Sequence, residues 1–189
     1  MKKKIFSGLM MLVFLMPVFY SDGIEAKNAA ITTPEAHFGF VPGADRMLFN
    51  YDALIAYLVK LDEQSTMLKL VEIGKSPMGK PIYIAFVSSE KNIENLNKLK
   101  ETNRLLALNP NLDERTRESL FENGKVFFLA TLSMHSGEVG PSQSAPLIAH
   151  KLLTSDDPKI LKWLDDVVYM MIPCHNPDGM DMVVKHYKK

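Results

Sequence analysis

Two side chains that could hold a divalent metal ion stand close together in the middle of the chain. His135 and Glu138 belong to the segment F-F-L-A-T-L-S-M-H-S-G-E-V, which runs from Phe127 to Val139. A neutral imidazole and a carboxylate on one short loop can both bind a single zinc ion. The spacing H-x-x-E alone is a weak signal, because a chain of this composition matches it by chance roughly one time in three.

The position of the pair in the chain is more informative than its spacing. The run Val126–Leu132 has almost no polar residue, which is typical of a strand covered on both faces. His135 and Glu138 follow just past the carboxyl end of this predicted strand. Because ligands of open α/β sheets bind in the crevice at that edge, the position favours a binding site.

A second polar loop is predicted at the same edge of the sheet. The apolar strand Val167–Ile172 is followed by C-H-N-P-D-G, Cys174–Gly179. Helical patterns after Pro141 and after Asp157 separate this strand from the preceding one. Two apolar strands joined by a helical crossover lie parallel, so both loops are expected to converge at one crevice.

The other elements predict an α/β domain over residues 50–189. Its sheet is expected to be mixed and largely parallel, with helices on both faces. Residues 27–49 carry prolines and glycines and are predicted to be an irregular lead-in. The remaining predicted elements are a helix capped by Asn50 and running to Leu61, an antiparallel hairpin of strands Met67–Gly74 and Pro81–Ser88 around the turn Ser76–Gly79, a helix capped by Asn92 and running towards Leu108, and a short helix Asp113–Asn123.

The N-terminus has the pattern of a secretory signal peptide. Lys2–Lys4 form a basic stretch, Ile5–Phe19 form an apolar stretch, and we expect cleavage after Ala26. The apolar stretch is shorter than the roughly 20 residues that a spanning helix needs. We therefore expect a secreted or periplasmic protein, with no stable membrane anchor once residues 1–26 are removed.

Composition narrows the function classes. The chain has 189 residues, a formal net charge of zero and 47% hydrophobic residues, which supports a packed core. A neutral balance gives no electrostatic reason to expect a nucleic-acid partner. Cys174 is the single cysteine, so no internal disulfide can form, and we expect it to be a buried free thiol.

The order of motifs resembles the zinc carboxypeptidase family, to which carboxypeptidase A belongs. A strand, H-S-G-E, a helix, a strand and N-P-D-G follow one another in that family's order. The segments F-G-F-V-P-G-A-D and V-E-I-G-K-S-P-M-G-K-P-I also resemble the N-terminal region of exported bacterial members, so the resemblance covers residues 38–189. It implies that His135 and Glu138 are zinc ligands. It also implies that Asn176 and Asp178 lie beside the substrate cleft, where Asp178 could support a ligand through a hydrogen bond.

The resemblance implies a zinc-dependent hydrolase acting on peptide or acyl-amino-acid bonds, by way of a metal-activated water. In that family the third ligand, the general-base glutamate and the substrate-binding arginines lie downstream of N-P-D-G. We therefore expect no catalytic residue in this chain and only weak zinc binding. The helical pattern of Met180, Val183, Val184 and Tyr187 has no closing residue before Lys189, which predicts a fragment cut within a helix.

Three alternatives remain open at this point. The chain could be a non-catalytic binding module or inactive remnant with the same fold. A serine hydrolase using Ser136 or Ser142 with His135 is disfavoured, because the chain lacks a G-x-S-x-G nucleophile elbow. His175 could be the third ligand, although the family does not use that position.

Overall fold

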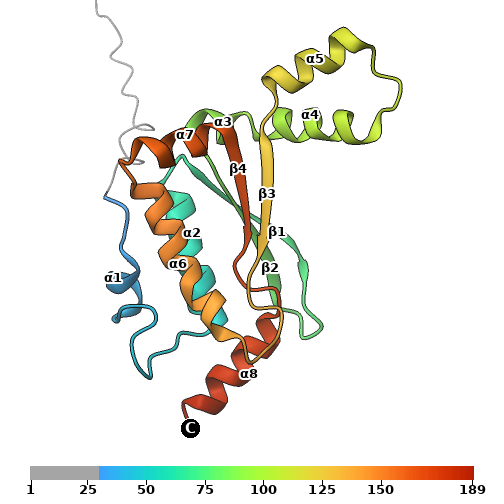
Figure 1. Cartoon of the computed structure of the whole chain (residues 1–189). Helices are drawn as coiled ribbons and strands as arrows, with labels where there is room; N and C mark the ends of the chain where they lie inside the picture. Colours follow the sequence, from blue (N-terminus) through green and yellow to red (C-terminus); the bar gives the residue numbers. More distant parts are fainter. Residues whose placement is uncertain (1–29) are drawn as a thin grey trace, which may run out of the picture.

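The computed structural model describes residues 30–189, and the predicted signal peptide lies outside this part of the chain. Helices and strands alternate in the order expected of an α/β domain (Figure 1). The elements are α1 (Pro34–Phe38), α2 (Tyr51–Gln64), β1 (Leu68–Lys75), β2 (Pro81–Val87), α3 (Glu90–Glu94), α4 (Leu96–Leu108), α5 (Glu114–Asn123), β3 (Val126–Thr131), α6 (Val139–Thr154), α7 (Pro158–Asp166), β4 (Val167–Ile172) and α8 (Pro177–Tyr187).

The four described strands form one mixed sheet in the order β1-β2-β4-β3. The strands β1 and β2 form the predicted antiparallel hairpin. The strands β3 and β4 pair in parallel from Val126 opposite Val167 to Thr131 opposite Ile172, which confirms the predicted helical crossover. Because β2 and β4 are antiparallel, two of the three pairs in the described part of the sheet are antiparallel.

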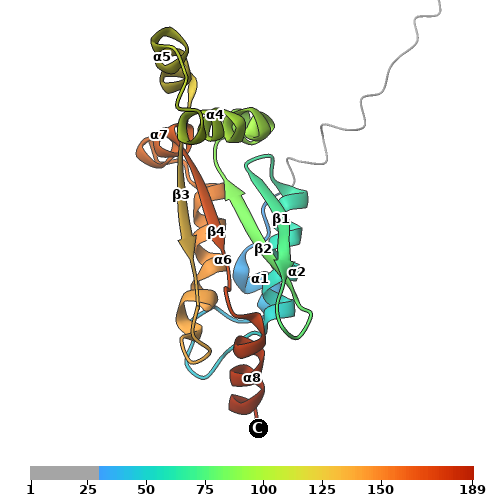
Figure 2. The same cartoon turned by 90° about the vertical axis from the view of Figure 1, so that its right-hand side faces the viewer.

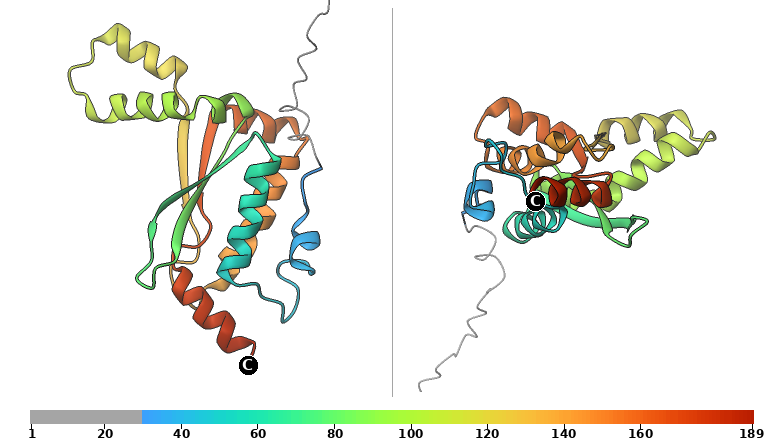
Figure 3. Two further views of the ribbon diagram at one scale, coloured as in Figure 1. Left: turned by 180° about the vertical axis from the view of Figure 1, so that it is seen from behind. Right: turned by 90° about the horizontal axis from the view of Figure 1, so that it is seen from below.

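Helices cover both faces of this sheet, as predicted. The helices α2 and α6 lie side by side along one face, where buried residues such as Leu58, Ala149 and Met171 form the larger core cluster (Figures 1 and 2). The helix α4 contributes Leu96 and Leu99 to a smaller cluster on the other face. In the views of Figure 3, α4 and α5 extend from one end of the sheet and α8 from the opposite end. No helix within residues 30–189 is long and apolar enough to cross a membrane.

The helix α2 forms as its sequence predicts. The Asn50 side chain accepts a hydrogen bond from the Ala53 backbone N–H at 3.0 Å, which satisfies one of the free donors at the helix start. The side chains of Leu54, Leu58 and Leu61 recur at helical spacing and are fully buried. Burying each such side chain contributes about 1.5–3 kcal/mol, so α2 anchors the core beneath the sheet.

The expectation that β3 is covered on both faces is wrong for the described part of the molecule. The strand lies at the edge of the sheet, and Val126, Phe128 and Leu129 are 63%, 54% and 51% exposed. The neighbouring strand β4 does meet the expectation, since Val168 and Met171 are fully buried. An apolar run shows that a strand can be covered, but it carries no information about which elements cover it.

Two local predictions also need correction. Asn92 does not cap a helix: it lies inside α3, is buried, and donates hydrogen bonds to Ser88 and to the Leu164 and Asp165 carbonyls. Asparagine favours helix starts and buried polar contacts alike, so its identity did not distinguish the two roles. The lead-in, predicted to be irregular, contains α1, which begins with a Thr33 cap and Pro34 in the first turn.

Candidate metal centre

The two polar loops predicted to converge do meet at the carboxyl edge of β3 and β4. The backbone N–H of His175 donates to the Leu132 carbonyl at 2.7 Å, and that of Asn176 donates to the Ser133 carbonyl at 3.2 Å. The Asn176 side chain then reaches the hydroxyl of Ser136, with Nδ2 and Oγ 3.4 Å apart. The parallel pairing of β3 with β4 therefore brings together two segments that are about forty residues apart in the sequence.

The loop that carries His135 and Glu138 is a closed turn. The Glu138 backbone N–H donates to the His135 carbonyl at 3.0 Å. At its base, buried Ser133 has a left-handed backbone with φ of 49°, and its hydroxyl donates to the Glu138 carbonyl. The same hydroxyl accepts the Ser142 backbone N–H at 3.0 Å, which ties the loop to the first turn of α6.

The sequence analysis did not identify Ser133 as part of the site. Its only sequence signal is its place directly after an apolar strand and two residues before His135. Left-handed backbone at a residue other than glycine is uncommon and persists where the surrounding structure enforces it. The hydrogen bonds to Glu138 and Ser142 provide that enforcement.

The side chains of His135 and Glu138 are exposed and available for a ligand. Within residues 30–189, neither the imidazole nor the carboxylate forms a hydrogen bond or an ion pair. Imidazole nitrogen and carboxylate oxygen are donor types that zinc accepts. The pair therefore fits two positions of a zinc site.

The described residues do not complete a metal site. No group of three histidine, cysteine, aspartate or glutamate side chains that could hold a metal ion occurs between residues 30 and 189. His175 is exposed and lies next to buried Cys174, so the two neighbours point apart, as expected for an extended segment. Burial raises the pKa of the Cys174 thiol, which keeps it protonated at neutral pH.

The residues of the N-P-D-G loop have separate contacts. The Asn176 side chain accepts the Gly179 backbone N–H at 2.9 Å and so caps α8. Asp178 is 8% exposed and faces the turn between β1 and β2. Its carboxylate oxygens accept the Ser76 hydroxyl at 2.8 Å and the Met78 backbone N–H at 3.1 Å. The observed contacts of Asp178 are thus with the hairpin turn.

A serine hydrolase gains no support from this arrangement. Ser142 is fully buried at the start of α6, and the Ser136 hydroxyl is the acceptor of the Asn176 amide. In the described part of the chain, neither hydroxyl forms a hydrogen bond with His135. A serine nucleophile needs a base within hydrogen-bond reach.

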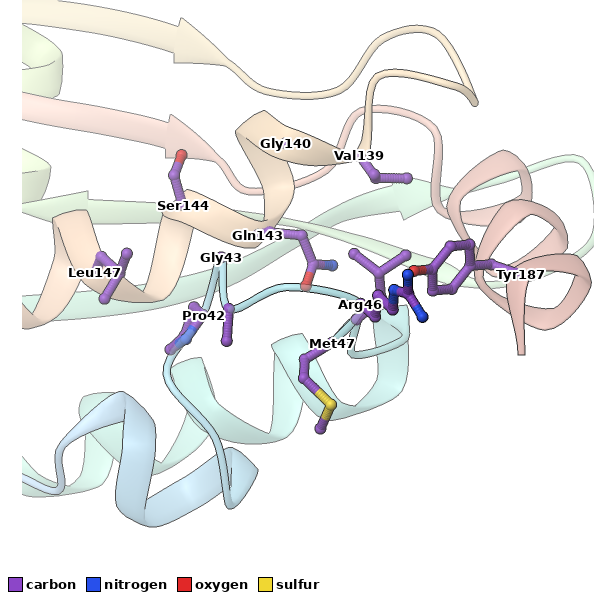
Figure 4. Close-up of a pocket in the computed structure, with 12 residues that line it drawn as sticks. Pro42, Gly43, Arg46, Met47, Val139, Gly140, Gln143, Ser144, Leu147 and Tyr187 are labelled. Carbon is purple, nitrogen blue, oxygen red and sulfur yellow. The ribbon is translucent and has the colours of Figure 1, made fainter.

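A hollow of about 340 Å³ borders the loop of residues 133–138, which carries His135 and Glu138 (Figure 4). Val139 and Gly140, which directly follow Glu138, form one wall, and Tyr187 at the end of α8 forms another. The third wall comes from residues 42–44 and 46–48 of the lead-in. The lining is mostly apolar, with the Arg46 guanidinium as its cation.

Comparisons with known proteins bear on the family and the fold of the chain. A family model described as zinc carboxypeptidase matches residues 54–188. The crystal structure of thrombin activatable fibrinolysis inhibitor has a TM-score of 0.54 at 12% identity, covering 87% of this chain and 33% of that chain. Carboxypeptidase A from Helicoverpa armigera has a TM-score of 0.44 at 17% identity, covering 77% of this chain and 31% of its own.

The chain therefore spans about a third of the length of these solved structures. A search of curated proteins finds no matching sequence. The structural likeness shows the fold, and the family model matches well over half of the residues. The chain belongs to the zinc carboxypeptidase family.

Proposed function

We propose that this chain is the N-terminal part of an exported, zinc-dependent metallocarboxypeptidase that hydrolyses peptide or acyl-amino-acid bonds. The observation that carries the proposal is the closed turn at the carboxyl edge of β3. It presents two exposed zinc-type donors, His135 and Glu138, that have no other partner among residues 30–189. Membership in the zinc carboxypeptidase family supports this assignment of the metal.

Three residues of the loop have a role in this proposal. The imidazole of His135 and the carboxylate of Glu138 hold the zinc ion, and Ser133 fixes the loop that presents them. Zinc in such a site supplies a Lewis acid that polarises a carbonyl group and lowers the pKa of water. Catalytic zinc sites usually have three protein ligands. We assign the third ligand, the general base and the substrate-binding arginines to residues that follow Lys189 in the complete protein.

The assignment beyond Lys189 is tested by reading the coding sequence past that codon. We expect an open frame of roughly a hundred residues or more, since whole domains of that size are normal. The frame should contain a further histidine, a glutamate and arginines. An immediate stop codon would overturn the catalytic proposal.

The role of the ligands is tested by hydrolysis of peptides with a free carboxyl terminus by the complete protein. Replacing His135 with alanine should abolish turnover, and a chelator should abolish it reversibly. The matched control is His150→Ala, a partly buried histidine of α6 outside the loop. Full activity of the His135 variant would refute the proposal, whereas the His150 variant should retain activity.

A non-catalytic binding module is the second candidate. It is favoured by the absence of a three-ligand group among residues 30–189. A module of this kind would bind peptides without hydrolysing them, and its affinity would not depend on zinc. Export is a separate part of the proposal, and the mature protein should begin near residue 27 when its N-terminus is sequenced.

A further inference from the structure

We propose that the turn between β1 and β2 positions the metal-ligand loop, residues 133–138, by holding the first turn of α8 against Ser136. The residues concerned are Ser76, Met78 and Lys80 of the turn, and Asp178, Gly179 and Asp181 of α8. In this arrangement Asp178 is a positioning residue, which acts through α8 and not by contact with a ligand. The inference rests on the proposed function only where it concerns zinc.

The first contact is between Asp178 and the turn. Both carboxylate oxygens are occupied, one by the Ser76 hydroxyl at 2.8 Å and the other by the Met78 N–H at 3.1 Å. Ser76 is itself buried, and its hydroxyl also accepts the Lys80 N–H at 3.0 Å. Gly79, with φ of +86°, allows the chain to reverse here. Charge-assisted hydrogen bonds of this kind are stronger than neutral ones, so the contact fixes the start of α8.

A second contact lies one helical turn further along α8. The Lys80 ammonium lies 2.7 Å from Asp181 and 2.9 Å from Asp52, the second residue of α2. The other oxygen of Asp181 accepts the Tyr51 backbone N–H at 2.9 Å. The hydrogen bond to Asp181 raises the pKa of Lys80, so the ion pair is intact at neutral pH. Because Asp178 and Asp181 are three residues apart, the turn contacts a single face of α8.

The metal-ligand loop touches α8 at Gly179. A Cβ atom built on Gly179 would lie 2.8 Å from the Cβ of Ser136 and would also overlap its hydroxyl. The Ser136 side chain thus packs against the backbone of Gly179, and the Asn176 amide lies 3.4 Å from its hydroxyl. Ser136 follows His135 and stands two residues before Glu138. A shift of α8 would therefore displace the segment between the two donors.

The decisive experiment is the variant Gly179→Ala in the full chain. Its added methyl group has no room unless Ser136 and the Asn176 amide, 2.8 Å from the added carbon, both move. The matched control is Gly140→Ala in the first turn of α6, where an added Cβ meets no atom within 4 Å. The first readout is the backbone amide NMR spectrum of residues 133–138 in the metal-free chain, and the second is affinity for cobalt(II) followed by its visible absorption.

We expect Gly179→Ala to shift the loop amides well beyond the changes in Gly140→Ala. We also expect it to weaken cobalt(II) binding by about tenfold or more, which is the usual effect of replacing a residue that holds a metal ligand in place. Adding Ser136→Gly to the Gly179 variant should restore part of the lost affinity, because it removes two of the three atoms that the new methyl group meets and leaves only the Asn176 amide. Effects that simply add, without rescue, would overturn the inference.

A less disruptive variant tests the same inference if Gly179→Ala does not fold. Ser76→Ala removes one hydrogen bond to Asp178 and adds no atom to the structure. It should shift the amides of residues 133–138, although Ser76 belongs to another part of the sequence. Unchanged loop amides in this variant would overturn the inference. Failure of the complete protein, with its third ligand, to bind cobalt(II) would overturn the zinc proposal alone, because the NMR readout needs no metal.

Discussion

Replacing Asn92 with alanine should destabilise the protein strongly, although this residue lies far from the metal-ligand loop. The buried amide donates to the Ser88 hydroxyl at 2.9 Å, to the Asp165 carbonyl at 2.9 Å and to the Leu164 carbonyl at 3.2 Å. These bonds join α3 to the junction of α7 and β4, the strand that leads into the N-P-D-G loop. Loss of the amide therefore affects the element that places that loop.

The size of the effect follows from what each partner loses. The Leu164 carbonyl keeps the Ser88 hydroxyl at 2.7 Å and the Ser89 N–H at 3.0 Å as donors. The Asp165 carbonyl loses the only side-chain donor that it has within residues 30–189. A net hydrogen bond contributes about 1 kcal/mol, and the Asp165 carbonyl belongs to an exposed residue, so water replaces the donor that it loses. We expect Asn92→Ala to lower the free energy of unfolding by about 2–3 kcal/mol, because three hydrogen bonds are lost.

Urea unfolding followed by far-ultraviolet circular dichroism measures this loss. With a urea dependence of about 2 kcal/mol per molar, the midpoint should fall by about 1–1.5 M. The control is Asn95→Ala, three residues further on, where an exposed amide donates to the Lys91 carbonyl at 2.8 Å and to no other group within residues 30–189. That variant should lose about 0.5 kcal/mol. Equal losses in the two variants would refute the reasoning.

Three further predictions concern the buried groups and the sheet edge. Burial raises the pKa of the Tyr51 and Tyr57 phenols above their ordinary value of about 10, because the folded protein disfavours the phenolate form. Stability should be fully present below about pH 10 and fall as the pH rises further, and Tyr57→Phe should make the fall in urea midpoint shallower. The Cys174 thiol should react slowly with an aromatic disulfide reagent in the native protein and rapidly in urea, and fast native labelling would contradict its burial. Leu129→Ala at the exposed edge should cost about 1 kcal/mol or less, whereas Met171→Ala on β4 should cost about 2–5 kcal/mol, and similar costs would contradict the observed exposure of β3.

Local signals predicted much of the fold. The cap at Asn50 and the burial of Leu54, Leu58 and Leu61 follow from helical spacing and from the preference of asparagine for helix starts. The parallel pairing of β3 with β4 follows from the helical crossover between two apolar strands. That pairing also predicts the observed contact between the loop of residues 133–138 and the N-P-D-G loop.

Contacts between distant residues could not be predicted in this way. The hydrogen bond between Ser76 and Asp178 joins residues 102 positions apart. The sequence around either residue gives no sign that the two are in contact. The close approach of Ser136 to Gly179 depends on how α8 leaves the sheet, which spacing does not determine. Exposure of β3 was missed because composition reports what a strand can bury and not what covers it.

Zinc affinity of the 189-residue chain tests the central claim most directly. We would measure it by competition with a chromophoric chelator for the unmodified chain, for His135→Ala and for Glu138→Gln. The account predicts weak binding by the unmodified chain, because two donors leave the ion short of the usual three protein ligands. Each replacement should lower the affinity by about tenfold or more. An affinity unchanged by either replacement would contradict the assignment of His135 and Glu138 as the zinc ligands.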